Sequence, residues 1–158
     1  IKKIKEIIPH CCIGVDVITG FPGETKAEYL KTYDFLNELD VSYLHVFTYS
    51  ERENTIAIDM SHQVPKKERQ ERSRMLRVLS GKKKRCFYET QKNKVRTVLF
   101  ESNIEDGKMQ GYTENYVRVA AKYDPMLVNE LKKVRLSKLD EKENFQVLEV
   151  EENFTTNT

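Results

Sequence analysis

The chain has 158 residues, of which 39% are hydrophobic and 33% are charged. This length allows one domain or two small ones, and no run approaches the roughly 20 apolar residues that a transmembrane helix needs, so we expect a cytoplasmic protein with no membrane partner. The three cysteines, Cys11, Cys12 and Cys86, are too few for a disulfide framework. The adjacent pair also lacks the spacing of a zinc or iron–sulfur site, so we expect no metal site in this chain.

The net charge of +2 is distributed unevenly along the chain. Residues 1–60 carry a net charge of −4 and residues 96–158 a net charge of −3, whereas residues 61–95 hold 12 Lys and Arg against 3 Asp and Glu, a net charge of +9. A block this basic is a candidate binding site for a polyanion, phosphates above all. A solvated helix face carrying the same charges is the alternative, and charge alone does not separate the two.

The first 60 residues have the pattern helix, strand, helix, strand. After an amphipathic helix, residues 13–20 form a nearly apolar run that is typical of a strand buried on both faces of a parallel sheet. Thr25 and Glu28 have the spacing of a capping box and predict a second helix, and residues 43–49 form the second strand. This order is a βαβ unit with a preceding helix. Because two strands are few for a parallel sheet, we expect further strands upstream in a longer native chain and exposed apolar surface here.

The composition changes after Pro65. Residues 66–91 are predicted to form a basic helix in which Gly81 is a weak point that can divide it in two. From residue 94 the pattern turns to four or five short strands rich in β-branched and aromatic residues, with a strand from 127 to 139 among them and a hairpin signal at Asp106-Gly107. These strands favour a small closed antiparallel barrel, because closure removes exposed strand edges.

These elements predict an α/β plus all-β protein in four parts. Residues 1–60 form the α/β part, residues 61–92 a basic helical connector, residues 93–154 the barrel and residues 155–158 a tail.

The most informative motif runs from Asp16 to Thr25, where a strand leads into Gly-Phe-Pro-Gly and then a capped helix. Gly20 and Gly23 allow a tight turn and the close approach of another molecule, and the amides at the helix start can hold an anion or a carboxylate. An ordinary tight βα loop is the alternative. The phosphate-loop pattern GxxxxGK[ST] is absent.

This motif resembles the C-terminal half of the radical S-adenosylmethionine methylthiotransferases, together with Tyr-Leu-His-Val-Phe-Thr-Tyr-Ser-Glu-Arg at 43–52 and Gln-Val-Pro at 63–65. Gly-Tyr-Thr-Glu-Asn-Tyr-Val-Arg-Val at 111–119 resembles the RNA-binding TRAM domain of those proteins, an OB-like barrel. Within the family, these segments are most similar to the MtaB-like branch, which modifies threonylcarbamoyladenosine beside tRNA anticodons.

The resemblance implies that residues 1–60 are the C-terminal portion of a partial (β/α) barrel. It also implies that the full-length enzyme uses S-adenosylmethionine and two [4Fe–4S] clusters to add a methylthio group to C2 of the modified adenosine. The family's Cys-x-x-x-Cys-x-x-Cys motif is absent here and would lie upstream. We therefore expect a fragment that is inactive and binds no cofactor alone. The implied partners are tRNA, through its anticodon stem-loop, and the missing N-terminal part of the chain; the sequence does not identify the sulfur donor.

Thirteen residues become candidate site residues, none of them catalytic. Five are expected at the cofactor: Ile18, Gly20, Phe47, Tyr49 and Arg52. Eight are expected to contact RNA, because RNA-binding proteins stack bases on aromatic rings and meet phosphates with cations: Lys82, Lys83, Lys84, Arg85, Tyr112, Tyr116, Arg118 and Lys122. Core packing is the alternative for Ile18 and the tyrosines, and a surface position is the alternative for Arg52. Arg52 also begins Arg-Glu-Asn-Thr-Ile-Ala, which departs from the family's Arg-Pro-Gly-Thr-Pro-Ala.

Other functions fit the same residues. One is a ribosomal-protein or isopentenyladenosine methylthiotransferase of the same family. Another is a stand-alone RNA-binding module without catalysis. Glu24 is expected only to complement the dipole of the helix that it precedes.

Overall fold

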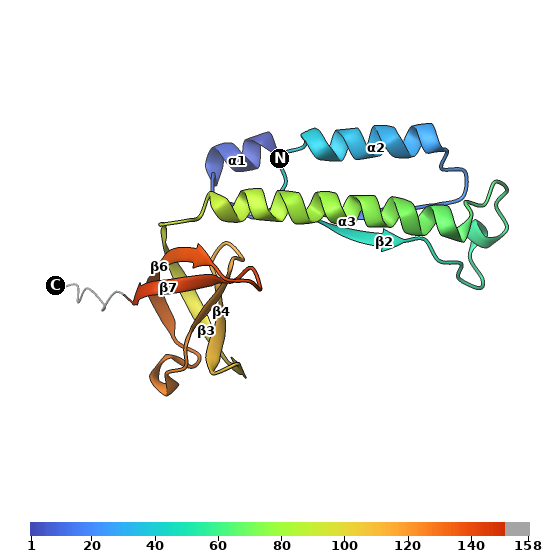
Figure 1. Cartoon of the computed structure of the whole chain (residues 1–158). Coiled ribbons are helices and arrows are strands. Elements are labelled where there is room, and N and C mark those ends of the chain that lie inside the picture. Colours follow the sequence, from blue (N-terminus) through green and yellow to red (C-terminus); the bar gives the residue numbers. More distant parts are fainter. Residues whose placement is uncertain (151–158) are drawn as a thin grey trace. The chain divides into compact units, whose positions relative to one another are not determined.

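The computed structural model describes residues 1–150, with side chains up to Val147, so the predicted tail and the last residues of the predicted barrel lie outside the described residues. The chain divides into two compact units, Ile1–Phe87 and the part that begins at Tyr88. The first unit contains α1 (Lys2–Ile7), β1 (Gly14–Thr19), α2 (Lys26–Glu38), β2 (Tyr43–Thr48), the 3-10 helix η1 (Ile56–Ile58) and nearly all of α3 (Lys66–Glu89) (Figure 1). The second contains β3 (Val95–Glu105), β4 (Lys108–Thr113), β5 (Arg118–Lys122), η2 (Pro125–Leu127), β6 (Leu131–Leu139) and β7 (Phe145–Val150).

The first unit is a small α/β structure, as the sequence predicts. β1 and β2 pair in parallel, in a register that runs from Gly14 opposite Tyr43 to Thr19 opposite Thr48. α2 and α3 supply most of the core that packs on one face of this sheet. The buried members of that core are Tyr29, Leu36, Val41, Leu44, Leu76 and Leu79. A two-stranded sheet is not itself a barrel, so the assignment of residues 1–60 to a partial (β/α) barrel stays a prediction.

The opposite face of the two-stranded sheet is open. Side chains alternate along a strand, so Val15 and Val17 pack toward the core while Asp16 and Ile18 point the other way. Ile18 is 59% exposed, and its register partner Phe47 is 53% exposed. The prediction of a strand buried on both faces is therefore wrong for the described residues, because helices pack on only one side. The expected exposed apolar surface is present.

Helix α3 is continuous from Lys66 to Glu89, so Gly81 does not divide it. A glycine in a helix interior costs about 1 kcal/mol relative to alanine. Leu76 and Leu79 before it and Phe87 after it are buried, and this packing outweighs that cost. No helix among residues 1–150 is both long enough and apolar enough to cross a membrane.

The second unit contains a closed five-stranded barrel in the order β3-β4-β5-β7-β6, which confirms the predicted closure. The expectation of a wholly antiparallel barrel is wrong, because β5 and β7 pair in parallel through Val119 opposite Phe145 and Ala120 opposite Gln146. The reason is geometric. Directions cannot alternate all the way around a closed ring with an odd number of strands, so one neighbouring pair must run parallel.

The barrel interior is filled by apolar side chains from all five strands. Those that are at most 1% exposed are Val98, Phe100, Met109, Val119, Val134, Leu136 and Phe145, and the turn residue Val117 joins them. The strand predicted from residue 127 begins only at Leu131, since η2 occupies the preceding turn and Asp124 caps it by accepting a hydrogen bond from the Met126 amide. A register shift between Phe100 and Ile104 bends the long strand β3.

Two glycines of the first unit give opposite predictions for the same substitution. A Cβ atom built on either Gly81 or Gly23 meets nothing within 4 Å, but Gly23 has a φ of +88° whereas Gly81 is helical. Gly81→Ala should therefore raise the free energy of unfolding by about 0.5–1 kcal/mol. Gly23→Ala should lower it, because an alanine is strained at positive φ. Urea denaturation followed by circular dichroism measures both changes, and a loss of stability in Gly81→Ala would contradict the account of α3.

Candidate functional site

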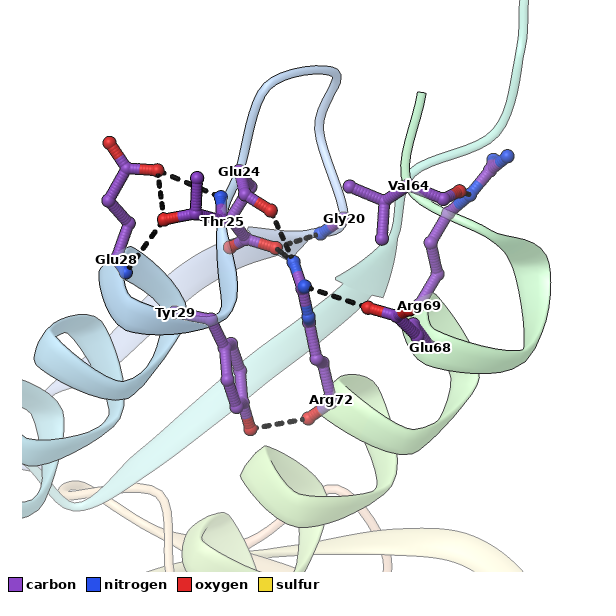
Figure 2. A network of polar contacts seen from close by, with 9 residues as sticks. All are labelled: Gly20, Glu24, Thr25, Glu28, Tyr29, Val64, Glu68, Arg69 and Arg72. Atoms are coloured by element: carbon purple, nitrogen blue, oxygen red, sulfur yellow. Dashed lines mark hydrogen bonds and ion pairs between the residues drawn. The ribbon is translucent and has the colours of Figure 1, made fainter. Parts of the chain in front are cut away.

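The loop between β1 and α2 has the geometry that its sequence predicts. Thr25 is the N-cap of α2: its Oγ1 accepts a hydrogen bond from the Glu28 amide at 3.2 Å. Glu28 returns the contact, because its carboxylate accepts from the Thr25 amide at 2.8 Å (Figure 2). This reciprocal capping box lowers the pKa of Glu28, since the two hydrogen bonds from Thr25 favour the ionised carboxylate.

Glu24 does more than complement a helix dipole. Its carboxylate accepts a hydrogen bond from the Gly20 amide at 2.7 Å and from the Arg72 guanidinium at 2.6 Å, which closes the turn and ties it to α3. Arg72 also donates to the Glu24 carbonyl at 2.8 Å and to the Glu68 carboxylate at 3.1 Å. Its own carbonyl accepts from the Tyr29 hydroxyl at 3.0 Å, and burial raises the pKa of Tyr29 to about 12, so that hydroxyl stays a donor. Figure 2 shows these contacts converging on Arg72.

Gly20 occupies a position that no other residue fits without movement. Its φ is +77°, and an added Cβ would clash with Cγ of Arg69. Arg69 passes this point to donate to the Val64 carbonyl at 2.7 Å and to the Tyr49 carbonyl at 3.1 Å. The same guanidinium pairs with Glu51 and holds the pKa of that carboxyl below its usual range. Arg69 therefore holds the segment after β2 by hydrogen bonds and packs against the turn after β1, which the sequence alone did not indicate.

The five predicted cofactor residues separate into three groups. Ile18 and Phe47 are register partners on the open face of the sheet. Gly20 and Tyr49 follow the ends of β1 and β2 and are linked through Arg69, whose guanidinium lies 5.5 Å from the Tyr49 ring centroid. Arg52 is exposed in the loop after β2, where its carbonyl accepts a hydrogen bond from the Thr55 hydroxyl. Their role at a cofactor stays a prediction.

The four predicted RNA-contacting residues of α3 are not equivalent. The Lys83 ammonium donates to the carbonyls of Asn37 and Leu39, at 3.0 and 2.7 Å, and so caps the C-terminus of α2. Burial lowers the pKa of Lys83. Lys84 is half-buried, whereas Lys82 and Arg85 are exposed. Lys82 and Arg85 are therefore the members of this group best placed for a partner.

Three of the predicted barrel residues come together. Tyr112 on β4 lies opposite Arg118 on β5, and the rings of Tyr112 and Tyr116 have centroids 5.4 Å apart. Tyr116 is 69% exposed, so core packing is not its role, and the Nε atom of Arg118 is buried without a hydrogen-bond partner among the described residues. Lys122 is exposed at the other end of β5, opposite Lys108.

A buried polar network holds Tyr116 outward. Asn115 is 6% exposed; its amide nitrogen donates to Oε1 of Gln91 at 3.0 Å, and its Oδ1 accepts from the Thr113 hydroxyl at 2.7 Å. With its side chain fixed in this way, the chain turns through Tyr116 at a φ of +65° and presents its ring to solvent. Sequence spacing alone cannot show which residue of Glu-Asn-Tyr is the anchor.

Two exposed residues beside the tyrosines, Leu99 and Leu131, were not expected from the sequence. Leu99 on β3 is the register partner of both Tyr112 and Leu131, and it is 46% exposed while Leu131 is 63% exposed. Tyr112, Leu99 and Leu131 therefore form a row across three strands on the outside of the barrel. Alternation along β3 was the available signal, since Leu99 falls between the buried Val98 and Phe100.

No group of three or more His, Cys, Asp or Glu residues within 1–150 is arranged to hold a metal ion. The cysteines Cys11, Cys12 and Cys86 are free thiols. The residues that the structure describes therefore do not fit an iron–sulfur cluster. The open sheet face of Ile18 and Phe47 has apolar surface that an organic cofactor could use, whereas Gly20 is buried against Arg69.

Several proteins similar to this chain are named as tRNA-modifying enzymes. The chain is 34% identical over 142 residues to the Bacillus subtilis (strain 168) protein named threonylcarbamoyladenosine tRNA methylthiotransferase MtaB, covering 87% of the chain and 32% of that relative. It is 38% identical over 119 residues to the Aquifex aeolicus protein of the same name, covering 75% of the chain and 28% of the relative. It is 32% identical over 136 residues to the tRNA-2-methylthio-N(6)-dimethylallyladenosine synthase of a Nitratiruptor species, covering 86% of the chain and 31% of the relative.

The chain thus spans about a third of the length of the curated relatives it matches. No protein-family model matches it. The resemblance expected from the sequence is confirmed, since the similarity covers about 75–89% of the chain.

Arg72→Met should unfold the first unit more easily. The substitution leaves the largely buried Glu24 carboxylate without its cationic partner, and breaking such a pair costs about 3 kcal/mol or more. Adding Glu24→Gln to Arg72→Met should recover part of the loss, because the unpaired charge is then gone. Urea denaturation of the unmodified protein, of Arg72→Met and of the double variant with Glu24→Gln measures these differences in the free energy of unfolding.

Arg74→Met is the matched control. Arg74 lies on the same helix and pairs with Glu71, but both side chains are more than half exposed, so the loss should be small. Equal losses in Arg72→Met and Arg74→Met would contradict the importance given to the Glu24–Arg72 pair.

Proposed function

We propose that this chain, which is homologous to the MtaB-like methylthiotransferases over most of its length, is part of an enzyme that adds a methylthio group to C2 of threonylcarbamoyladenosine in tRNA. The proposal rests on its 34–38% identity to proteins named for that reaction, which extends over both structural units. The reaction is proposed to use radical S-adenosylmethionine chemistry. The clusters would be held outside this chain, since its described residues offer no ligand set, and we expect the chain alone to be inactive.

We assign the open face of the first unit to the wall of the cofactor site. S-adenosylmethionine would supply the radical chemistry when bound. Ile18 and Phe47 offer adjacent apolar surface of the kind that packs against an adenine ring. Gly20 is buried against Arg69, so its proposed part is to allow the tight turn beside this surface. Glu24, Arg69 and Arg72 touch no ligand in this account; they hold the Gly20 turn and the end of β2 in place.

We assign the barrel to RNA binding, in the manner of a TRAM domain. Tyr112 and Tyr116 present neighbouring, mutually tilted rings on the outer surface beside Arg118, a combination that suits an unpaired base and its phosphate. Lys122, and Lys82 and Arg85 on α3, would add contacts to phosphates. The target proposed for this surface is the anticodon stem-loop, where unpaired bases are displayed.

The names of several similar proteins favour a second candidate substrate. Several similar proteins at 31–33% identity are named tRNA-2-methylthio-N(6)-dimethylallyladenosine synthase. The alternative substrate is therefore dimethylallyladenosine, with the same chemistry and the same tRNA region. The identities are too close to separate the two branches by themselves.

Nucleoside analysis separates the two substrates. Deleting the gene that encodes this chain should remove the methylthio derivative of threonylcarbamoyladenosine from digested tRNA and leave that of dimethylallyladenosine unchanged. Liquid chromatography with mass spectrometry measures both nucleosides, and re-expression of the gene is the control. Loss of only the dimethylallyladenosine derivative would replace the first substrate by the second, and no change in either would reject both.

Tyr116→Ala should reduce the preference of the chain for a tRNA anticodon stem-loop over an unrelated hairpin. A stacked base is worth roughly 1–3 kcal/mol, which corresponds to a change of about 5–150-fold. Because the Tyr116 side chain is exposed, the variant should fold normally, and circular dichroism checks this. Filter binding measures the preference, with Met126→Ala as the control because Met126 is 78% exposed on the same unit and has no assigned role. Equal effects of the two substitutions would count against the assignment of Tyr116.

A further inference from the structure

Side chains of α3 occupy the outer edge of strand β2. The Ser80 hydroxyl accepts a hydrogen bond from the Leu44 amide and donates one to the Leu44 carbonyl, each at 2.8 Å. One turn earlier, Arg77 donates to the Val46 carbonyl at 3.4 Å. Backbone groups two residues apart face the same edge of a strand, so the backbone of Thr48 faces α3 as well.

A pocket of about 360 Å³ lies where this pattern reaches Thr48. Its lining consists of Thr48, Gln70, Ser73, Arg74, Arg77 and Val78. These residues bring two guanidinium groups, two hydroxyls and an amide together, and no carboxylate lines the pocket. A lining with several donors and no carboxylate of its own is suited to a bound oxyanion, although the Arg74 guanidinium is already paired with Glu71.

Ser73 is the second and independent indication of a ligand. The residue is 2% exposed, and its Oγ has no hydrogen-bond partner among residues 1–150. Buried hydroxyls are normally hydrogen-bonded, because leaving one unpaired forfeits its hydration without replacement. Ser73 and Arg77 both line this pocket, and an acceptor that reached the buried Ser73 hydroxyl from it would satisfy that hydroxyl.

The cation available to such an acceptor is Arg77. Arg74 already forms two hydrogen bonds with the Glu71 carboxylate, at 2.7 and 3.0 Å. Arg77 is exposed, and its one hydrogen bond given by the described structure is the long contact to Val46. A guanidinium with one long hydrogen bond retains further N–H donors, which can bind two oxygens of the same oxyanion.

We propose that this pocket binds a phosphate group, with Arg77 and the Ser73 hydroxyl as its donors. The phosphate could be a phosphodiester of the RNA backbone or free inorganic phosphate, and the chemistry of recognition is the same. The RNA source rests on the proposed function, whereas the site itself does not. Apart from Thr48, the lining residues of the pocket belong to the most basic segment of the chain, residues 61–95.

The first experiment titrates the isotopically labelled chain with inorganic phosphate at constant ionic strength and follows amide resonances by NMR. Saturable shifts at Thr48 and Ser73 are expected in the unmodified protein and should be lost in Arg77→Gln and Ser73→Ala. Lys31→Gln removes an exposed cation of α2 outside the pocket and should behave as the unmodified protein does. Ser73→Ala should keep or raise the melting temperature, since it removes an unpaired buried hydroxyl, so its loss of binding would not reflect unfolding.

The second experiment measures tRNA binding of the same proteins at several salt concentrations. If an RNA phosphodiester fills the pocket, Arg77→Gln should weaken binding to every RNA and flatten the log–log salt slope by about 0.7–0.9, the value for one phosphate contact, while Lys31→Gln leaves both unchanged. Phosphate shifts with an unaltered salt slope would support the site and identify free phosphate as its ligand.

The absence of saturable phosphate shifts, together with equal tRNA binding by Arg77→Gln and Lys31→Gln, would overturn the proposal. Intact tRNA binding by the unmodified chain would then still support the proposed function. Conversely, phosphate binding without any tRNA binding would support the pocket and count against the RNA-binding role.

Discussion

The first unit depends on two arginines that lie three residues apart on α3. Arg69 and Arg72 reach the loops that follow the two strands, and each binds both a carboxylate and backbone carbonyl groups there. Parallel strands have no hairpin between them, so the ends of β1 and β2 need a separate connection to hold their loops in place. Arg72 ties the turn after β1 through Glu24, and Arg69 ties the segment after β2. The residues that would face a cofactor are therefore positioned by a helix that comes later in the chain.

The same helix explains why the charge of residues 61–95 overstates the surface available to RNA. Arg69 and Arg72 are buried in ion pairs, Arg74 pairs with Glu71, and Lys83 caps α2. These cations serve the fold of the first unit. A net charge counted along the sequence includes them, whereas a partner meets only the cations that remain exposed, such as Lys82 and Arg85.

The barrel is held together by closure of its strands rather than by arginines from a neighbouring helix. Closure satisfies the strand edges, and the single parallel pair allows five strands to form the ring. The exposed aromatic surface depends on Asn115, whose buried amide binds Gln91 and Thr113 and so fixes the turn that carries Tyr116. A buried polar group is costly unless it is hydrogen-bonded, and here the hydrogen bonds of the Asn115 amide also orient a candidate base-stacking ring.

The sequence by itself determined the local structure and the family. The capping box at Thr25 and Glu28, the parallel βαβ order, the hairpin at Asp106-Gly107 and the closed barrel follow from short-range patterns of apolar residues, glycines and caps. The tertiary structure alone decided what lies far apart in sequence but close in space. Arg72 meets Glu24 across 48 residues and Lys83 meets Leu39 across 44, while the Ser73 hydroxyl has no hydrogen-bond partner among residues 1–150. Periodicity assigns a residue to a face of its own helix or strand, but the partner across that face is set by how the elements pack.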